Sequence, residues 1–206
     1  MRHMLITILL VIVVFAILLF QFPADRRFTL FFINKTLGQS AVIFIGLSFL
    51  LGPLCKIFHF LSPHIHFRKY FGLFGFGIVV LHILTSLLQW QDRFNLKWYG
   101  DHIIGIIGAI VATIIFLVLA ITSHNQLIRM LGGHRWKTVQ RVGYVALILT
   151  LFHIFIVASA RWQQWQAGKV DMPTNFLIFV FGIVVLVARL LALIVDKKRA
   201  ATTIPV

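Results

Sequence analysis

Residues 102–122 read HIIGIIGAIVATIIFLVLAIT, a stretch that contains no Asp, Glu, Lys or Arg. A helix needs about 20 consecutive apolar residues to cross the hydrocarbon core of a bilayer. Within lipid every backbone polar group must find its partner inside the chain, so a spanning segment of this kind has to be helical. The stretch therefore predicts a transmembrane helix.

Similar apolar runs occur on both sides of this stretch. The expected spans are about residues 5–20, 38–58, 70–90, 102–122, 139–160 and 175–195. The first is the shortest and could instead be a signal peptide, but the small-x-small cleavage pattern around residues 22–24 is poor. No internal repeat is evident, and the connections are too short for a second folded domain. We expect residues 1–206 to form a single all-α membrane domain of six transmembrane helices.

The composition agrees with this fold class. Of the 206 residues, 60% are apolar and 12% are charged, whereas soluble domains carry roughly 25% charged residues. These values exclude a soluble globular domain, a disordered chain and a disulfide scaffold. The single cysteine, Cys55, cannot form an intrachain disulfide.

The basic residues predict the orientation. The formal net charge is +14, but the Lys and Arg residues stand between apolar runs, which indicates a cytoplasmic membrane face rather than nucleic-acid binding. Eleven of them fall on the side of the two termini and seven on the other side, with Arg189 inside the last span. The positive-inside rule then places both termini in the cytoplasm. Interfacial tryptophans agree with these boundaries: Trp90, Trp98, Trp162 and Trp165 on the outer side and Trp136 on the inner side.

Two histidines lie well inside the predicted spans. His82 follows the start of the third span by 12 residues, and His153 follows the start of the fifth span by 14. At 1.5 Å per residue their depths are roughly 18 and 21 Å, which puts both imidazoles at one level in the outer half of the membrane. A matched pair on two helices suits the two axial ligands of a b-type haem. The alternative is a pair of histidines that only bond to neighbouring helices.

Small residues recur at fixed distances before both histidines. Gly72 and Gly75 stand ten and seven residues before the first, and Gly143 and Ala146 stand at the same distances before the second. These steps return to nearly the same helix face. The strip could leave room for a flat macrocycle or for a donor molecule. We favour this interpretation because the strip recurs at the same distances before both histidines; the alternative is close packing between helices.

Other possible sites are weaker. His59, His64 and His66 could bind a metal in the first cytoplasmic connection, but no carboxylate or thiol accompanies them. His102 could bond a haem propionate or simply cap a helix. No nucleophile motif, phosphate loop or nucleotide fingerprint is present, and no acid lies within a predicted span.

Several ordered motifs carry a resemblance to a known family. They are Gly52-Pro53-Leu54, Arg68, Phe71-Gly72-Leu73, Leu81-His82, Leu119-Ala120-Ile121-Thr122-Ser123, Met130-Leu131-Gly132, Arg135-Trp136-Lys137, Gly143-Tyr144 and His153. In order and spacing, over about residues 36–160, this set resembles the ferric reductase-like transmembrane domain family. Within that family it is most similar to the haem-binding membrane subunits of bacterial methionine sulfoxide reductase systems, the MsrQ group.

The resemblance implies a haem-binding helical bundle in a bacterial inner membrane that passes electrons outward. It makes His82 and His153 the axial ligands of haem b. Relatives carry a second histidine in the fifth span where this chain has Gln140, so one haem is expected, on the outer side. Arg68 and Arg135 are candidate contacts for a propionate, a quinone or FMN.

The implied partners are the lipid bilayer, a quinol or flavin reductase as donor and a periplasmic reductase subunit as acceptor, with no nucleic acid. Because both axial positions of the iron would be filled, electron relay suits the site better than oxygen chemistry. Two alternatives remain at this point. The chain could be a ferric or quinone reductase that acts alone, or a haem-free membrane scaffold or transporter.

Overall fold

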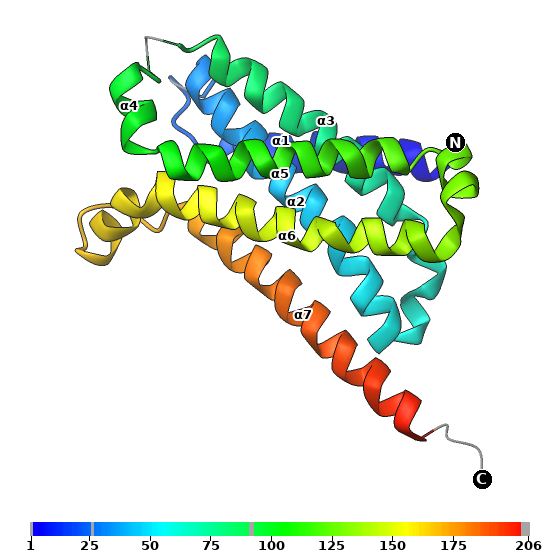
Figure 1. Cartoon of the computed structure of the whole chain (residues 1–206). Coiled ribbons are helices and arrows are strands. Elements are labelled where there is room, and N and C mark those ends of the chain that lie inside the picture. The colour runs from blue at the N-terminus through cyan, green and yellow to red at the C-terminus, as the bar shows by residue number, and fades with distance from the viewer. Residues whose placement is uncertain (1, 26, 91–92, 203–206) are drawn as a thin grey trace.

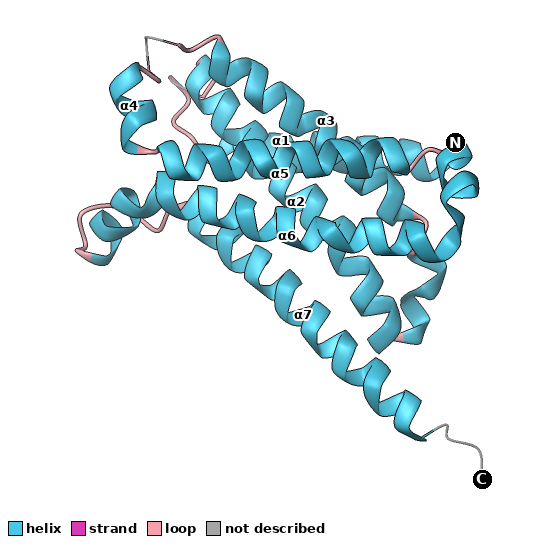
Figure 2. Cartoon of the chain, in the orientation of Figure 1, coloured by secondary structure: helices cyan, strands magenta, loops and turns pink. Residues whose placement is uncertain are grey.

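The computed structural model describes residues 2–25, 27–90 and 93–202. Figure 1 shows its helices: α1 (Arg2–Phe20), α2 (Leu30–Ile57), the short 3-10 helix η1 (His59–His64), α3 (Phe67–Leu87), α4 (Leu96–Asp101), α5 (Ile103–Thr122), α6 (Asn125–Gln166) and α7 (Thr174–Thr202). The described residues form helices and loops with no strand (Figure 2). Six helices are long and apolar enough to cross a membrane, which confirms the prediction of an all-α, six-span fold.

The helices are arranged around α2. It packs against α1, α3 and α7, and α5 pairs with α6 along its length (Figure 1). The start of α1 and the end of α7 point toward one side of the bundle, and α4 lies at the other. We call these the terminal end and the α4 end.

Helix α2 begins at Leu30, earlier than the predicted start at residue 38. After the apolar first turn it contains several polar residues, and Asn34, Thr36 and Gln39 among them are buried. The Thr36 hydroxyl donates to the Phe32 carbonyl, and the Asn34 amide donates to Ser86 on α3. Polar side chains with partners on the same or a neighbouring helix let the helix continue inside the bundle, because the cost of burying them is offset.

Helix α6 extends beyond the predicted span 139–160 at both ends. It starts at Asn125, turns at Gly132 and continues to Gln166. Gly132 has φ 72° and ψ 156°, a combination that is essentially restricted to glycine. The predicted connection after the fourth span is therefore helical, with one sharp turn.

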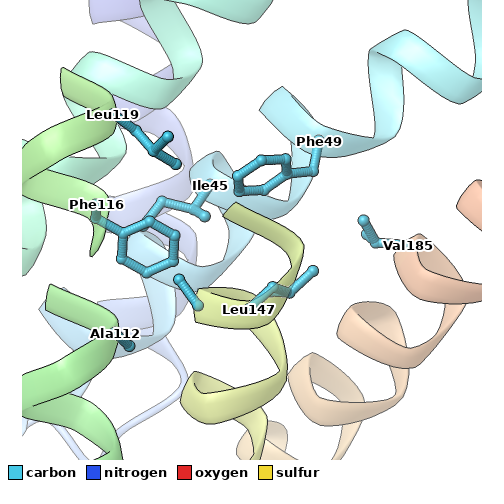
Figure 3. Close-up of a cluster of buried hydrophobic side chains, with 8 residues drawn as sticks. Ile45, Phe49, Ala112, Phe116, Leu119, Leu147 and Val185 are labelled. Carbon is cyan, nitrogen blue, oxygen red and sulfur yellow. The ribbon is translucent and has the colours of Figure 1, made fainter. Parts of the chain in front are cut away.

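The main core lies where α2, α5, α6 and α7 meet (Figure 3). It contains the buried residues Ile45, Phe49, Ala112, Phe116, Leu119, Ala146, Leu147 and Val185. Many large apolar side chains outside it are exposed and suit contact with lipid chains. Since lipid is as apolar as leucine, close packing rather than the hydrophobic effect must hold such helices together. The molecule is a multi-pass membrane protein.

Candidate functional site

His82 and His153 line one cavity at the α4 end of the bundle. The cavity has a volume of about 590 Å³ and lies among α2, α3, α5 and α6, with α4 at its mouth. Its walls are mostly apolar, as for other sites that enclose a flat organic molecule. The matched depths expected from the sequence thus correspond to two imidazoles that face the same space.

The imidazole of His82 is held by α2. Its Nδ1 lies 3.0 Å from the carbonyl oxygen of Asn34. A Cβ atom on Gly38 would lie only 3.1 Å from Cε1 of the His82 ring, so a glycine allows α2 to approach the ring this closely. One turn of α2 therefore supplies both the hydrogen-bond acceptor and the space for the ring.

The imidazole of His153 is held by α5 in the same way. Its Nδ1 lies 3.1 Å from the carbonyl oxygen of Gly105. A Cβ atom on Gly105 would lie 2.9 Å from Cβ of Ile156, which is closer than real Cβ contacts. The absence of a side chain at Gly105 thus brings α5 close enough to α6 for its carbonyl to reach the ligand ring.

These two contacts fix the tautomers of both rings. A carbonyl oxygen can only accept a hydrogen bond, so each Nδ1 must carry the proton and each Nε2 keeps its lone pair. Metal-bound histidines commonly donate their second ring N–H to such a partner, which orients the ring. The residues present fit a haem held between His82 and His153.

A polar cluster ties α2 to α3 beside His82. The Asn34 amide nitrogen donates to Ser86 Oγ over 3.1 Å, and Thr85 Oγ1 donates to Asn34 Oδ1 over 2.7 Å. Ser86 also donates to the His82 carbonyl over 2.8 Å. The cluster stabilises the Asn34 backbone that carries the acceptor for the histidine.

Aromatic rings close the cavity at the α4 end. Phe94, Trp98 and Tyr99 line it, and their rings contact one another or Trp90 at centroid distances of 4.6 to 5.4 Å. His102 stacks on Trp98 with centroids 4.5 Å apart, and its Nδ1 lies 2.8 Å from the Trp98 carbonyl. The position of His102 agrees with the capping alternative, because it ends α4 and begins α5.

A second cavity, of about 800 Å³, lies at the terminal end. Among the described residues that line it there is no Asp or Glu, and the basic ones are Lys56, Arg68, Lys69, Lys137, Arg141 and Arg189. Lys56 pairs with Asp196 on α7, and Lys69 donates to Asn125 over 2.9 Å. The guanidinium of Arg189 lies 5.3 Å from the centroid of the Tyr144 ring.

Gln140 lines the same cavity. Its amide nitrogen lies 3.3 Å from the Leu119 carbonyl and 3.3 Å from Thr122 Oγ1. Arg135, in contrast, is exposed and lines neither cavity. The lining residues of α6 follow a helical repeat that runs through positions 136, 137, 140, 141 and 144, and Arg135 lies off this face.

The small residues before the two histidines contact α2. A Cβ atom on Gly75 would lie 2.8 Å from Ile45 Cγ1, and one on Gly143 would lie 2.2 Å from the Phe49 ring. Ala146 is fully buried in the core. Of the four, only Gly72 lines a cavity, the one at the terminal end. The strip therefore supports helix packing, the alternative raised from the sequence.

Two side chains form part of the wall of both cavities. Ile45 of α2 and Phe116 of α5 line both of them. Figure 3 shows these side chains next to each other in the core. We call this pair the partition.

The histidines of the connection between α2 and α3 do not gather around a site. His66 stacks with His3 at a centroid distance of 5.9 Å, and His64 stacks on Phe67 at 6.4 Å. Within residues 2–25, 27–90 and 93–202 no three His, Cys, Asp or Glu side chains are grouped as metal ligands.

Comparison with known proteins places the chain in a family. The magnetosome protein MamZ of Magnetospirillum gryphiswaldense is 30% identical over 161 residues, which are 68% of this chain and 24% of MamZ. The protein-methionine-sulfoxide reductase haem-binding subunit MsrQ of Herminiimonas arsenicoxydans is 30% identical over 164 residues, 77% of this chain and 68% of MsrQ. MsrQ of Azospira oryzae is 33% identical over 131 residues, 59% of this chain and 52% of that protein.

The chain thus spans about a quarter of the length of MamZ and between half and two thirds of these MsrQ proteins. Residues 37–151, which include His82 and end two residues before His153, match the family described as ferric reductase like transmembrane component. The resemblance expected from the sequence is confirmed, and the chain belongs to the ferric reductase-like transmembrane component family.

Proposed function

We propose that this protein carries electrons across a bacterial inner membrane through one b-type haem, ligated by His82 and His153, as the membrane subunit of a reductase system. One observation carries the proposal. The two imidazoles line one cavity, and a backbone carbonyl holds the Nδ1 proton of each. The names of the MsrQ relatives, which describe a haem-binding subunit of a reductase, support it.

A haem held by His82 and His153 would supply one-electron chemistry. The chain's own residues do the rest. His82 on α3 and His153 on α6 would hold the haem through Nε2, and the mostly apolar lining would limit the access of water. Asn34 and Gly105 keep the imidazole planes in orientation through their carbonyls.

The cavity at the terminal end suits an electron donor such as a quinol or FMN. Arg68, Arg141 and Arg189 line it, and guanidinium groups bind anionic oxygens well. Gly72 gives the donor access to the wall formed by α3. Arg135 lies outside this cavity, so we leave it out of the donor site.

The acceptor would dock at the α4 end. Orientation by the positive-inside rule puts that end in the periplasm, because the Lys and Arg residues are more numerous at the terminal end. The contacting rings of Trp90, Phe94, Trp98 and Tyr99 lead from the cavity toward this face. A periplasmic reductase subunit is the expected acceptor.

A reduced-minus-oxidised spectrum of the purified protein, together with a pyridine haemochrome assay, tests the proposal. We expect a low-spin b-type spectrum and one haem per chain. Gln140→His should also stay at one haem, because no histidine stands opposite it on α3 at that level. Protein that inserts and folds but binds no haem would overturn the proposal, and two haems per chain would show that a ligand pair has been missed.

A further inference from the structure

One charged side chain, which is not a proposed haem ligand, lines the cavity of the two histidines. Among the described residues that line it, Lys35 is the only Lys, Arg, Asp or Glu. Its Nζ lies 5.1 Å from the centroid of the Phe22 ring. Within the described residues Lys35 forms no ion pair with a carboxylate, and Arg161 adds a second positive charge that repels it.

A hydrogen-bond donor without an acceptor lies beside it. Gln39 is 5% exposed, lines the same cavity, and its Nε2 has no hydrogen-bond partner. Its Oε1 is already occupied, since Gln21 Nε2 donates to it over 2.9 Å. Gln21 in turn accepts from Thr174 at the start of α7. This chain of hydrogen bonds therefore ends at the Gln39 side-chain NH2 group, which has no acceptor.

The two groups lie on one face of α2. Positions 35 and 39 are four residues apart, which makes their side chains neighbours on a helix. Gly38, which contacts the His82 ring, stands between them in sequence. Lys35 is three residues nearer the α4 end than Gly38, roughly 4.5 Å along the helix axis. The cation thus lies on the α4 side of the contact between Gly38 and the histidine, and Gln39 lies next to that contact.

An unpaired cation and an unsatisfied amide are each costly in a mostly apolar cavity. A single carboxylate would satisfy both, through a charge-assisted hydrogen bond to Nζ and a second bond to Nε2. We propose that Lys35 and Gln39 bind a carboxylate of the cavity's occupant, a haem propionate, and so fix which way the haem edge points. This rests on the proposed haem function.

The first test uses the purified holoprotein with Lys35→Met and Gln39→Leu. Each variant should lose haem to apomyoglobin roughly tenfold faster than the wild type, as expected for a lost hydrogen bond to a charged group. Each should also shift the propionate bending bands in the resonance Raman spectrum, and Lys35→Met should lower the haem midpoint potential because a cation favours the reduced form.

Matched controls separate this role from a structural one. Lys169→Met removes an exposed lysine at the same end of the bundle and should change nothing. Gln21→Leu removes the bond to Gln39 but leaves the free N–H in place, so haem loss should stay near the wild-type rate. Lys35→Arg keeps the charge and should restore slow haem loss.

The second test identifies the group that is bound. Apoprotein is reconstituted with haem or with haem dimethyl ester, whose propionates carry no charge. Wild-type protein should hold the ester more weakly than haem, whereas Lys35→Met should hold both alike. An equal ester penalty in the two proteins, with unshifted Raman bands, would mean that Lys35 extends to the membrane surface and would overturn the assignment. Failure of wild-type apoprotein to bind haem at all would instead overturn the proposed function.

Discussion

The geometry of the candidate site depends on backbone carbonyl groups and on glycines that lack a side chain. The carbonyls of Asn34 and Gly105 orient the two imidazoles, and Gly38 lets α2 lie against the ring of His82. A backbone acceptor cannot be removed by a point mutation, but the distance to it can be changed. The geometry of the two histidines is therefore most sensitive to the size of the residues that let the helices approach.

Removal of either imidazole should abolish the low-spin spectrum. His82→Ala or His153→Ala leaves one axial position of the iron without a protein ligand. We expect the variants to insert in the membrane but to lose the b-type signal in a reduced-minus-oxidised spectrum. The variants His59→Ala, His64→Ala and His66→Ala should keep this signal, since these side chains do not line the cavity of His82 and His153. A normal spectrum in both ligand variants would refute the assignment.

Enlargement of Gly38 should weaken haem binding without removal of a ligand. In Gly38→Val the new side chain would meet the His82 ring, because even a Cβ atom lies 3.1 Å from Cε1. Changes to the groups that orient a ligand typically cost 10–100-fold in affinity, and we expect about that loss in a haem titration of the apoprotein. Gly77→Val is the matched control, as no atom lies within 4 Å of a Cβ there. Equal affinity of the two variants would contradict the close approach of α2.

The sequence was sufficient to select the two histidines but not their supports. His82 and His153 stand out because an ionisable group in an apolar run is rare. The roles of Gly38 and Gly105 depend on which helix lies opposite, and nothing local encodes that. Arg189 was set aside as a residue within a span, yet it lines the basic cavity.

At the scale of elements, α6 links the two ends of the molecule. It carries Gln140 and Arg141 at the terminal cavity and His153 at the other, on one continuous helix after Gly132. The turn at Gly132 directs the chain from the end of α5 into this helix (Figure 1). The position of the α6 residues that line the basic cavity thus depends on the backbone conformation of Gly132.

Gly132→Ala should destabilise that turn. At φ 72° and ψ 156° a Cβ atom is strained even where space is open, at a cost of about 1–3 kcal/mol. We expect a lower thermal unfolding midpoint and faster proteolysis near residues 125–135 in detergent. Gly133→Ala has equal space and regular helical geometry, so it should be neutral or slightly stabilising. The same midpoint in both variants would argue against the turn.

The number of membrane-spanning helices was predicted correctly, but the residues at which they begin and end were predicted less well. Hydropathy located all six spans because each contains a long apolar run. It missed the first turns of α2, where Asn34 and Thr36 are buried through partners on α3 and on α2 itself. It also missed the helix before Gly132, since an amphipathic surface helix has no apolar run.

At the scale of the whole molecule, the two cavities and the uneven distribution of basic residues suggest the direction of electron transfer. The basic cavity opens toward the terminal end, and the histidine cavity lies toward the α4 end. The single-domain organisation and the cytoplasmic location of both termini stay predictions from the sequence.

Sealed vesicles with uniformly inserted protein and reduced haem test that direction. An oxidant that cannot cross the membrane should reoxidise the haem quickly from the α4 end and slowly from the terminal end. The histidines lie nearer the α4 end, and electron transfer slows steeply with distance. Protease accessibility of the tail after α7 gives the orientation independently. Faster reoxidation from the terminal end would show that the depth of the site is wrong.

The partition of Ile45 and Phe116 has a bioenergetic consequence. Neither side chain can carry a proton, and no Asp or Glu among the described residues lines the cavity on either side. If the terminal end faces the cytoplasm, as the sequence predicts, protons released by a donor there would stay on that side while electrons alone move outward, so turnover would transfer net charge. One charge moved across 100 mV corresponds to about 2.3 kcal/mol. A membrane that is negative inside would therefore accelerate the reaction, and an ionophore that collapses the voltage would slow it.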